Sequence, residues 1–146
     1  MPASPALKTD EAEVLSANQA FYEALRELSL KKMSALWWQE DWVSCLHPGW
    51  ELLMGWEEVY DSWRNIFRST DQMRIIVSRA VVHVQGDVAW VSCIESVTST
   101  HEEGFETAVV EATNIFVRRQ GEWRMAHHHS SLLPDQVPSG ASRSVQ

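Results

Sequence analysis

Three side chains in the second half of the chain bring acid, amide and imidazole chemistry into stretches that are otherwise apolar. Glu95 lies between Ile94 and Ser96, while Asn114 and His128 interrupt the segment EATNIFVRRQGEWRMAHHH. A carboxyl group among apolar side chains loses hydration, so its pKa rises and it can act as a general base near neutral pH. An imidazole can exchange a proton or hold a hydrogen bond. Glu95 and His128 are therefore the catalytic candidates, and Asn114 is a candidate ligand-binding residue.

Each of these residues also has a structural interpretation. Glu95 can pair with Asn114, His128 or Arg124 across a sheet without touching a ligand. A buried Asn114 needs a hydrogen-bond partner in any case, whether a neighbour, a water or a ligand. The sequence leaves structure, ligand binding and catalysis open for Glu95, and with them the question of whether the chain is an enzyme.

The strands that carry these residues are predicted to turn them to one face. Apolar runs on both sides of the polar turn Arg119–Glu122 predict a hairpin over Phe105–Leu133. Side chains alternate between the two faces of a strand. We expect Glu95, Asn114 and Ser130, each on a different strand, to point to the same inner face of the sheet. The rest of the inward set is mostly small or apolar: Ala89, Val91, Cys93, Val97, Val110, Ala112, Phe116, Arg124, Ala126 and His128. Such a face suits a ligand cavity, with Ser130 among its binding residues.

The opposite face of the same strands is apolar as well. Its residues are Trp90, Ile94, Thr113, Ile115, Val117, Met125 and His127. A large exposed apolar surface marks an interface, so we expect a two-fold homodimer through this outer face of the sheet.

Three consecutive histidines, His127, His128 and His129, invite a metal interpretation. Consecutive strand residues point to opposite faces, so the three cannot bind one ion. No Cys or carboxylate spacing suited to a metal accompanies them. We therefore expect no metal site.

Aromatic residues gather in the middle of the chain, where a short hairpin and a helix are predicted to close one end of the sheet. Trp42, Trp50 and Trp63 suit the wall of a pocket for a flat apolar ligand, and Tyr60 shares a helix stripe with Trp63. Core packing explains the same residues. As candidates they join Asn114 and Ser130 as ligand-binding residues.

The element order predicts an α+β fold in which helices come first and a meander of strands follows. Helices are expected from about Asp10 to Leu28, from Ser29 onward and from Trp56 to Phe67. Strands are expected over Asp41–Leu46, Glu51–Met54, Met73–Val84 and Val88–Thr100, before the final hairpin. Residues 1–9 are predicted to be disordered, residues 10–133 to form the single domain, and residues 134–146 to be a flexible tail.

Composition excludes several classes of partner. The net charge of −8 argues against nucleic acid and against anionic membrane surfaces. No signal-peptide pattern and no apolar run of roughly 18 residues is present, which argues against a membrane protein. Cys45 and Cys93 lack metal or redox spacing and are typical of free thiols in a reducing compartment. The expectation is a cytoplasmic protein that needs no cofactor.

Element order and three segments (DWVSCLHPGWELLMGWEEV, AWVSCIES and EATNIFVRRQGEWRMAHHH) resemble the nuclear transport factor 2-like superfamily, and within it the SnoaL-like branch. The last segment is also similar to the end of the association domain of calcium/calmodulin-dependent protein kinase II. The resemblance extends over about residues 10–134. It implies a cone-shaped fold, with three N-terminal helices packed on a strongly curved, mainly antiparallel sheet, an inner pocket and a dimer built through the open sheet face.

This resemblance implies more than one function, because the superfamily includes ketosteroid isomerase-like enzymes, dehydratases, cyclases, hydrolases and non-catalytic hubs. In the kinase association domain, basic residues enter the pocket at positions that match Glu95, Asn114 and Ser130. All three departures remove positive charge, which disfavours an anionic ligand. Tyr22 and Tyr60 are candidates for the phenol donors that some enzymes of this fold use, and core packing explains Tyr60 equally well.

Two hypotheses follow. The first is a SnoaL-like protein that binds a small apolar or aromatic molecule in the cone, as an isomerase, cyclase, dehydratase or hydrolase with Glu95 as general base. The alternative is a non-catalytic dimerisation or assembly module that resembles the kinase association domain.

Overall fold

The first helix of the chain, α1 (Pro5–Arg26), starts before Asp10 in the computed structural model, which describes residues 4–134. The Ser4 side chain accepts a hydrogen bond from the Leu7 amide at 3.1 Å, and Pro5 suits the first helical position. Asp10, where the helix was expected to begin, lies inside α1, and its carboxylate contacts Arg118 at 2.7 Å. The predicted disorder of residues 1–9 is therefore wrong for residues 5–9. The predicted tail lies, apart from Pro134, outside the described residues.

The elements between the first helix and the long strands follow the predicted order but are shorter. Helix α2 (Leu30–Leu36) is capped by Ser29, and strands β1 (Ser44–Leu46) and β2 (Leu53–Met54) form the short hairpin. Gly49 has φ of 82° in the turn between them, as a type II turn requires. Helix α3 (Trp56–Ser69) confirms the strongly apolar stripe that begins at Trp56.

Six strands form one curved sheet in the order β2-β1-β6-β5-β4-β3. The long strands are β3 (Gln72–Gln85), β4 (Val88–His101), β5 (Gly104–Arg119) and β6 (Glu122–Leu132). Neighbouring strands in the described part of the chain are antiparallel except β1 and β6, which are parallel. The predicted α+β class, with helices on a mainly antiparallel sheet, is confirmed.

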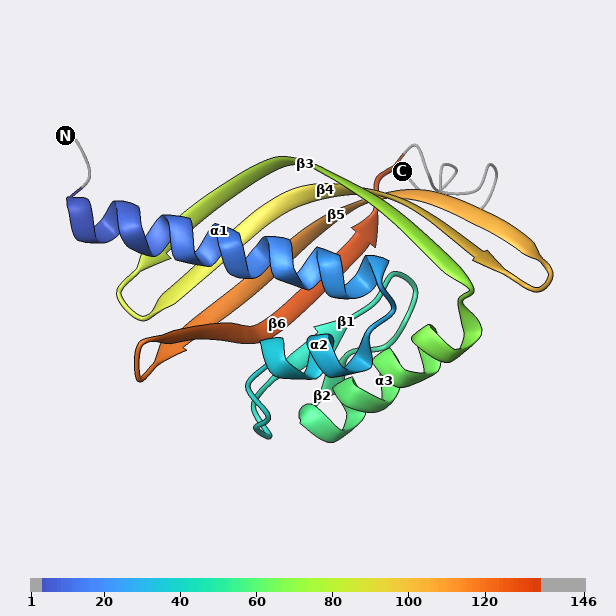
Figure 1. The fold of residues 1–146 in the computed structure, drawn as a ribbon, viewed down its shortest axis with the longest axis horizontal. Helices are drawn as coiled ribbons and strands as arrows, with labels where there is room; N and C mark the ends of the chain where they lie inside the picture. Colours follow the sequence, from blue (N-terminus) through green and yellow to red (C-terminus); the bar gives the residue numbers. More distant parts are fainter. Residues whose placement is uncertain (1–3, 135–146) are drawn as a thin grey trace.

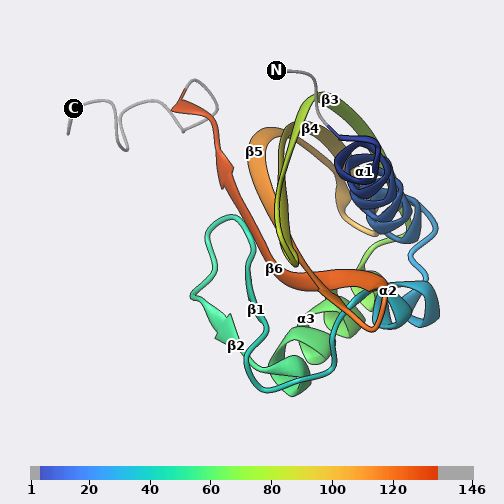
Figure 2. The same ribbon diagram turned by 90° about the vertical axis from the view of Figure 1, so that its left-hand side faces the viewer.

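All three helices lie on one side of this sheet. Helix α1 runs along its curved inner face, and α2 and α3 cover the end near β1 and β2 (Figure 1). The view at right angles shows the long strands bending past α1 (Figure 2). Among the buried side chains between these layers are Phe21, Met33, Trp37 and Phe116. Among residues 4–134, no helix combines the length and the apolarity that crossing a bilayer requires.

A bulge in the last strand pair corrects one predicted side-chain direction. Ile115 pairs with His127, but Phe116 pairs with Met125, so Ala126 is the extra residue of β6. Both Met125 and Ala126 are therefore buried. Met125 was expected on the outer face and lies in the core, because the alternation of side chains restarts on the far side of a bulge.

Candidate functional site

Asn114 and His128 are direct neighbours across the inner face of the sheet. Asn114 pairs with Val91 on β4 and with His128 on β6, and His128 pairs in turn with Cys45 on β1. All of these side chains are buried. The predicted strand phase is confirmed here.

Glu95 shares this inner face but does not touch Asn114. It lies opposite Val110 on β5 and Val77 on β3, four residues along β4 from Val91. Its side chain is only 5% exposed. The sequence therefore predicted the correct face for Glu95. The strand register, however, does not bring Glu95 into contact with Asn114.

The residue that joins them is Tyr22, from the middle of α1. Its hydroxyl donates to Glu95 Oε2 at 2.5 Å and accepts from Asn114 Nδ2 at 3.1 Å. The hydroxyl also lies 3.2 Å from Cys93 Sγ. Tyr22 is 1% exposed, so this phenol reaches the sheet from the helix with almost no contact to solvent.

A second helix residue holds the other end of the amide. Asn18 lies one helical turn before Tyr22, so both point to the same side of α1. Asn114 Nδ2 donates to Asn18 Oδ1 at 2.8 Å, and Asn114 Oδ1 lies 2.6 Å from His128 Nδ1. Glu95, Tyr22, Asn114, Asn18 and His128 thus form one continuous buried network, which we call the inner network.

Burial sets the protonation of this network. It raises the pKa of Glu95 to about 7, although the hydrogen bond from Tyr22 opposes part of that rise. Burial, with the nearby Glu95 carboxyl and Cys93, also raises the pKa of Tyr22 far above its usual range, so the phenol stays protonated. Burial lowers the pKa of His128 well below its ordinary value. Near neutral pH, the network therefore contains one group, Glu95, that exchanges its proton readily.

A second buried histidine, His47, follows β1. Its Nε2 lies 3.0 Å from Ser62 Oγ on α3, and its ring packs at 4.7 Å from Trp63 and 6.3 Å from His128. Burial lowers the pKa of His47 to about 4, so this imidazole is also neutral.

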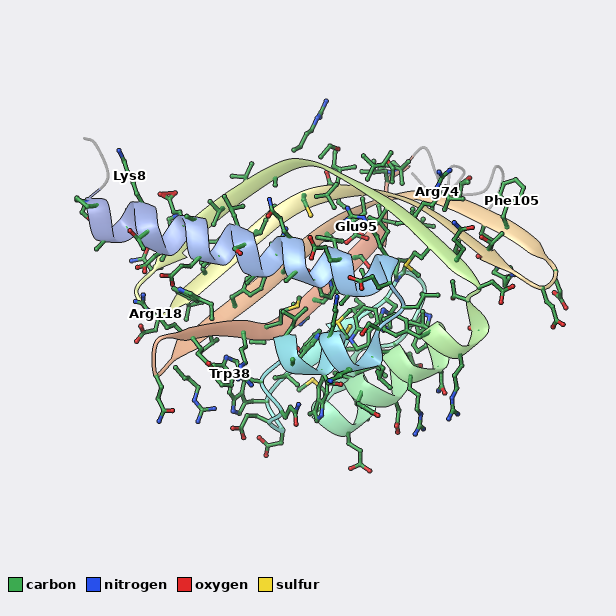
Figure 3. The ribbon with its side chains drawn as sticks, in the orientation of Figure 1. Lys8, Trp38, Arg74, Glu95, Phe105 and Arg118 are labelled. Atoms are coloured by element: carbon green, nitrogen blue, oxygen red, sulfur yellow. The ribbon has the colours of Figure 1, made fainter. Side chains whose placement is uncertain are left out.

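Both histidines and Glu95 line one cavity of about 380 Å³ between the helices and the inner face of the sheet. Figure 3 shows Glu95 where α1 passes over the long strands. Apolar side chains make up much of the wall, including Leu25, Pro48, Trp63, Ile66, Met73, Ile75, Val97, Ala108, Val110 and Leu132. The arrangement therefore places a carboxyl group with a pKa of about 7 in a mainly apolar cavity.

The structure brings five of the predicted site residues to this cavity: Glu95, His128, Ser130, Trp50 and Trp63. Asn114 lies one layer behind, inside the inner network.

Two predicted aromatic residues lie outside the lining. Trp42 is 44% exposed and lies in a turn before β1 begins, so no strand directs it inward. Tyr60 packs 5.7 Å from Trp56, four residues earlier on α3, and this places it away from the cavity wall.

Sequence reasoning missed Asn18 and Ser62, and it gave Tyr22 no more weight than Tyr60. Asn18 and Ser62 are polar residues on the otherwise apolar stripes of α1 and α3, and both are 3% exposed. A polar residue on such a stripe is the signal that could have identified them.

The outer face of the sheet has a separate hollow of about 590 Å³. Its lining includes Ile94, Ile115, His127 and His129, together with Arg79 at a bulge in β3. Trp90 is cross-strand to Ile115 on this face and is 39% exposed. His127 and His129 therefore face outward, whereas His128 faces inward, as strand alternation predicts.

The chain belongs to the SnoaL-like domain family, whose model matches residues 14–136. Among solved structures, it is similar to a candidate dehydratase of the nuclear transport factor 2-like family from Streptomyces avermitilis. The two are 35% identical with a TM-score of 0.80, over 86% of this chain and 97% of the other. The chain is also similar to a candidate association domain of calcium/calmodulin-dependent protein kinase type II from Thiobacillus denitrificans. That pair is 35% identical with a TM-score of 0.71, over 80% and 92% of the two chains.

A curated relative is the F-box protein SKIP8 of Arabidopsis thaliana, which is 31% identical over 120 residues. The match takes in 82% of this chain and 49% of the relative, so the chain spans about half of that protein's length. These comparisons establish the superfamily and the fold that the sequence resemblance implied. They include both enzyme-like and association-type relatives.

Proposed function

We propose that the chain binds a small, mainly apolar molecule in the inner cavity, and that Glu95 exchanges a proton with it as a general acid or base. The reaction would be an isomerisation, cyclisation, dehydration or hydrolysis. The observation that carries this proposal is a carboxyl group with a pKa of about 7 that lines an apolar cavity. Proton transfer is most efficient when the pKa of the catalytic group lies near the working pH.

The geometry supports distinct roles for the two oxygens of Glu95. Tyr22 donates to Oε2, whereas Oε1 has no hydrogen-bond partner among residues 4–134. The exchangeable proton therefore belongs on Oε1. His128, which lines the same cavity, would bind a polar group of the ligand. The similarity to a candidate dehydratase supports this class of chemistry.

Binding itself is tested with a thermal-shift panel of neutral aromatic and terpenoid compounds. At least one compound should raise the melting temperature, since a ligand at 100 times its Kd adds about 2.7 kcal/mol of stability. Trp50→Ala should reduce that shift, because Trp50 lines the cavity and its ring lies 4.8 Å from His47.

Trp42→Ala is the matched control for this experiment. Trp42 and Trp50 are both 44% exposed, but Trp42 lies outside the cavity. The ligand-induced shift of the Trp42 variant should equal that of the wild-type protein. Equal loss in both variants, or no stabilising compound in the panel, would contradict the proposed cavity function.

The second candidate function is self-association, and the exposed apolar outer face favours it. Trp90, Ile94 and Ile115 lie on this face beside a hollow, and one similar structure is a candidate association domain. We propose a homodimer through the outer face. It is compatible with ligand binding, since the inner cavity opens on the other side of the sheet.

Ile115→Arg should convert that dimer to a monomer, because its cross-strand neighbours Trp90 and His127 offer no carboxylate. A buried guanidinium without a partner is strongly disfavoured at an apolar interface. Light scattering coupled to size-exclusion chromatography measures the mass directly. Phe105→Arg is the control: Phe105 is 69% exposed and lies at the start of β5, away from the hollow (Figure 3). A wild-type protein that is monomeric at all concentrations would refute the proposal.

A cytoplasmic location is likewise part of the proposal. Cys45 and Cys93 are both buried free thiols, and burial raises the pKa of each. Thiols of this kind are compatible with a reducing compartment. Fluorescent tagging of the full-length protein in its native cell would test it.

A further inference from the structure

Two histidines of the inner cavity each have one unprotonated ring nitrogen, and these nitrogens limit the kind of ligand that the cavity can bind. His128 and His47 both line it, and both are neutral because burial lowers the pKa of each. A neutral imidazole has one N–H and one lone pair, so the contact made by one nitrogen fixes the other. In each ring, one nitrogen contacts a side chain of the protein, Asn114 for His128 and Ser62 for His47. The other hydrogen bonds of that side chain show that it presents an oxygen acceptor to the ring.

For His128, the assignment comes from Asn114. The amide nitrogen Nδ2 of Asn114 uses its two hydrogens for Asn18 Oδ1 and for the Tyr22 hydroxyl. Asn114 therefore presents its oxygen to His128 at 2.6 Å, and His128 Nδ1 must carry the proton. His128 Nε2 is left as an unprotonated acceptor.

For His47, the assignment comes from Ser62. The Ser62 hydroxyl donates to the Val59 carbonyl at 2.7 Å, so its oxygen accepts from His47 Nε2 at 3.0 Å. The Cys45 sulfur, 3.7 Å from the same nitrogen, is a second and weaker acceptor for that proton. The proton of His47 is therefore on Nε2, and Nδ1 is the bare acceptor. The two buried rings thus have opposite tautomers, and each retains a lone pair.

The rest of the wall agrees with a ligand that donates hydrogen bonds and has no negative charge. Of the described residues that line the cavity, none is Lys or Arg, whereas Glu95 and Glu106 are both present. A carboxylate or phosphate would meet lone pairs and carboxyl groups with no cation.

We propose that the cavity selects an uncharged, hydroxylated ring compound whose hydroxyl group donates to His128 Nε2. A hydrocarbon or an ether has no hydrogen to donate to that lone pair. Asn18 and Asn114 are then positioning residues, because they set the tautomer of His128. This inference rests on the proposed role of the cavity as a ligand site.

The tautomers are tested first, on the full chain without a ligand. In protein labelled with ¹⁵N-histidine at neutral pH, His128 should show a protonated Nδ1 and a pyridine-type Nε2, with His47 reversed. His128→Gln and His47→Gln assign the signals by their loss. An Nε2–H tautomer or a charged ring at His128 would overturn the inference.

Asn18→Ala tests whether the helix sets this tautomer. Without the Asn18 oxygen, Asn114 can turn its amide over, so the His128 signals should show a mixture of the two tautomers. Gln19→Ala, an exposed change on the same helix, should leave them unchanged. A His128 tautomer that does not change in folded Asn18→Ala would remove Asn18 from the proposed role.

Ligand selection is measured by calorimetry with three matched probes: 2-naphthol, 2-methoxynaphthalene and 2-naphthoate. Naphthol should bind about tenfold more tightly than its methyl ether, which cannot donate, and naphthoate should not bind measurably. Equal binding of naphthol and its ether, or preferred binding of naphthoate, would overturn the proposal. If none of the three binds while the tautomers are as expected, the proposed ligand-binding function of the cavity fails, and this inference fails with it.

Discussion

Glu95→Gln is expected to make the protein more stable at pH 8 while it abolishes proton transfer in the cavity. The ordinary pKa of a glutamate is 4.5, and burial raises that of Glu95 to about 7 in the folded protein. Between these values, the folded state holds a proton that the unfolded state has released. The contribution of protonated Glu95 to the free energy of unfolding is therefore fully present below about pH 4.5, and it is lost as the pH rises to 7.

The size of the effect follows from the same two values. Each pKa unit corresponds to 1.36 kcal/mol, so the ionised Glu95 side chain destabilises the folded state by about 3 kcal/mol above pH 7. Glutamine has almost the same shape, can accept from Tyr22 and does not ionise. The free energy of unfolding of Glu95→Gln minus that of the wild type should rise by about 3 kcal/mol from pH 4.5 to pH 8.

Urea unfolding at several pH values measures this difference. The neutral histidines titrate in the same range, but they are present in both proteins and cancel in the subtraction. Tyr22→Phe is the companion variant: it removes the hydrogen bond that opposes the rise. The pKa of Glu95 should therefore increase further. A Glu95→Gln variant that is less stable than the wild type at pH 8 would show an ionised, structural carboxylate.

The activity of the same variant separates catalysis from structure. Once a ligand is found, exchange of its acidic hydrogens with D₂O should fall by about 100-fold or more in Glu95→Gln, because the general base is missing. A more stable protein with less activity is the pattern expected of a catalytic site. Unchanged exchange would exclude Glu95 as the base and favour the association function.

Asn114→Ala is expected to be the most destabilising single substitution in the inner network. The change leaves the His128 Nδ1–H and the Asn18 oxygen without their partner, and Tyr22 loses a donor. Each unsatisfied buried group costs about 1 to 3 kcal/mol. We expect a total of about 3 to 5 kcal/mol in the free energy of unfolding, measured by urea denaturation at pH 7.

The neighbouring residue on the same strand is the natural control. Thr113 faces the opposite, outer side of β5 and is only half-buried. Thr113→Ala at the same protein concentration should cost less than about 1 kcal/mol. Similar losses at the two positions would mean that the inner network contributes little to stability.

The sequence alone determined the fold class and the faces of the strands. Apolar spacing located α3, and alternation around Glu95, Asn114 and His128 placed all three on the buried face. These features are local: a period of two or of 3.6 residues is decided by neighbours in the chain. The family resemblance then implied the curved sheet and the cavity.

Local patterns were less informative where a single residue changes the outcome. Ser4 starts α1 earlier than the apolar stripe indicates, because a cap depends on one hydrogen bond. The bulge at Ala126 moves Met125 to the core, since one extra residue restarts the alternation. Neither event leaves a periodic signal.

Tertiary structure alone decided how the site works. Tyr22 and Glu95 are 73 residues apart in the chain, and Asn18 and Asn114 are 96 apart. Only the packing of α1 on the sheet places the Tyr22 hydroxyl between Glu95 and Asn114. The same packing places the Asn18 oxygen against the Asn114 amide. Burial, which is a property of the whole fold, then raises the pKa of Glu95 to about 7.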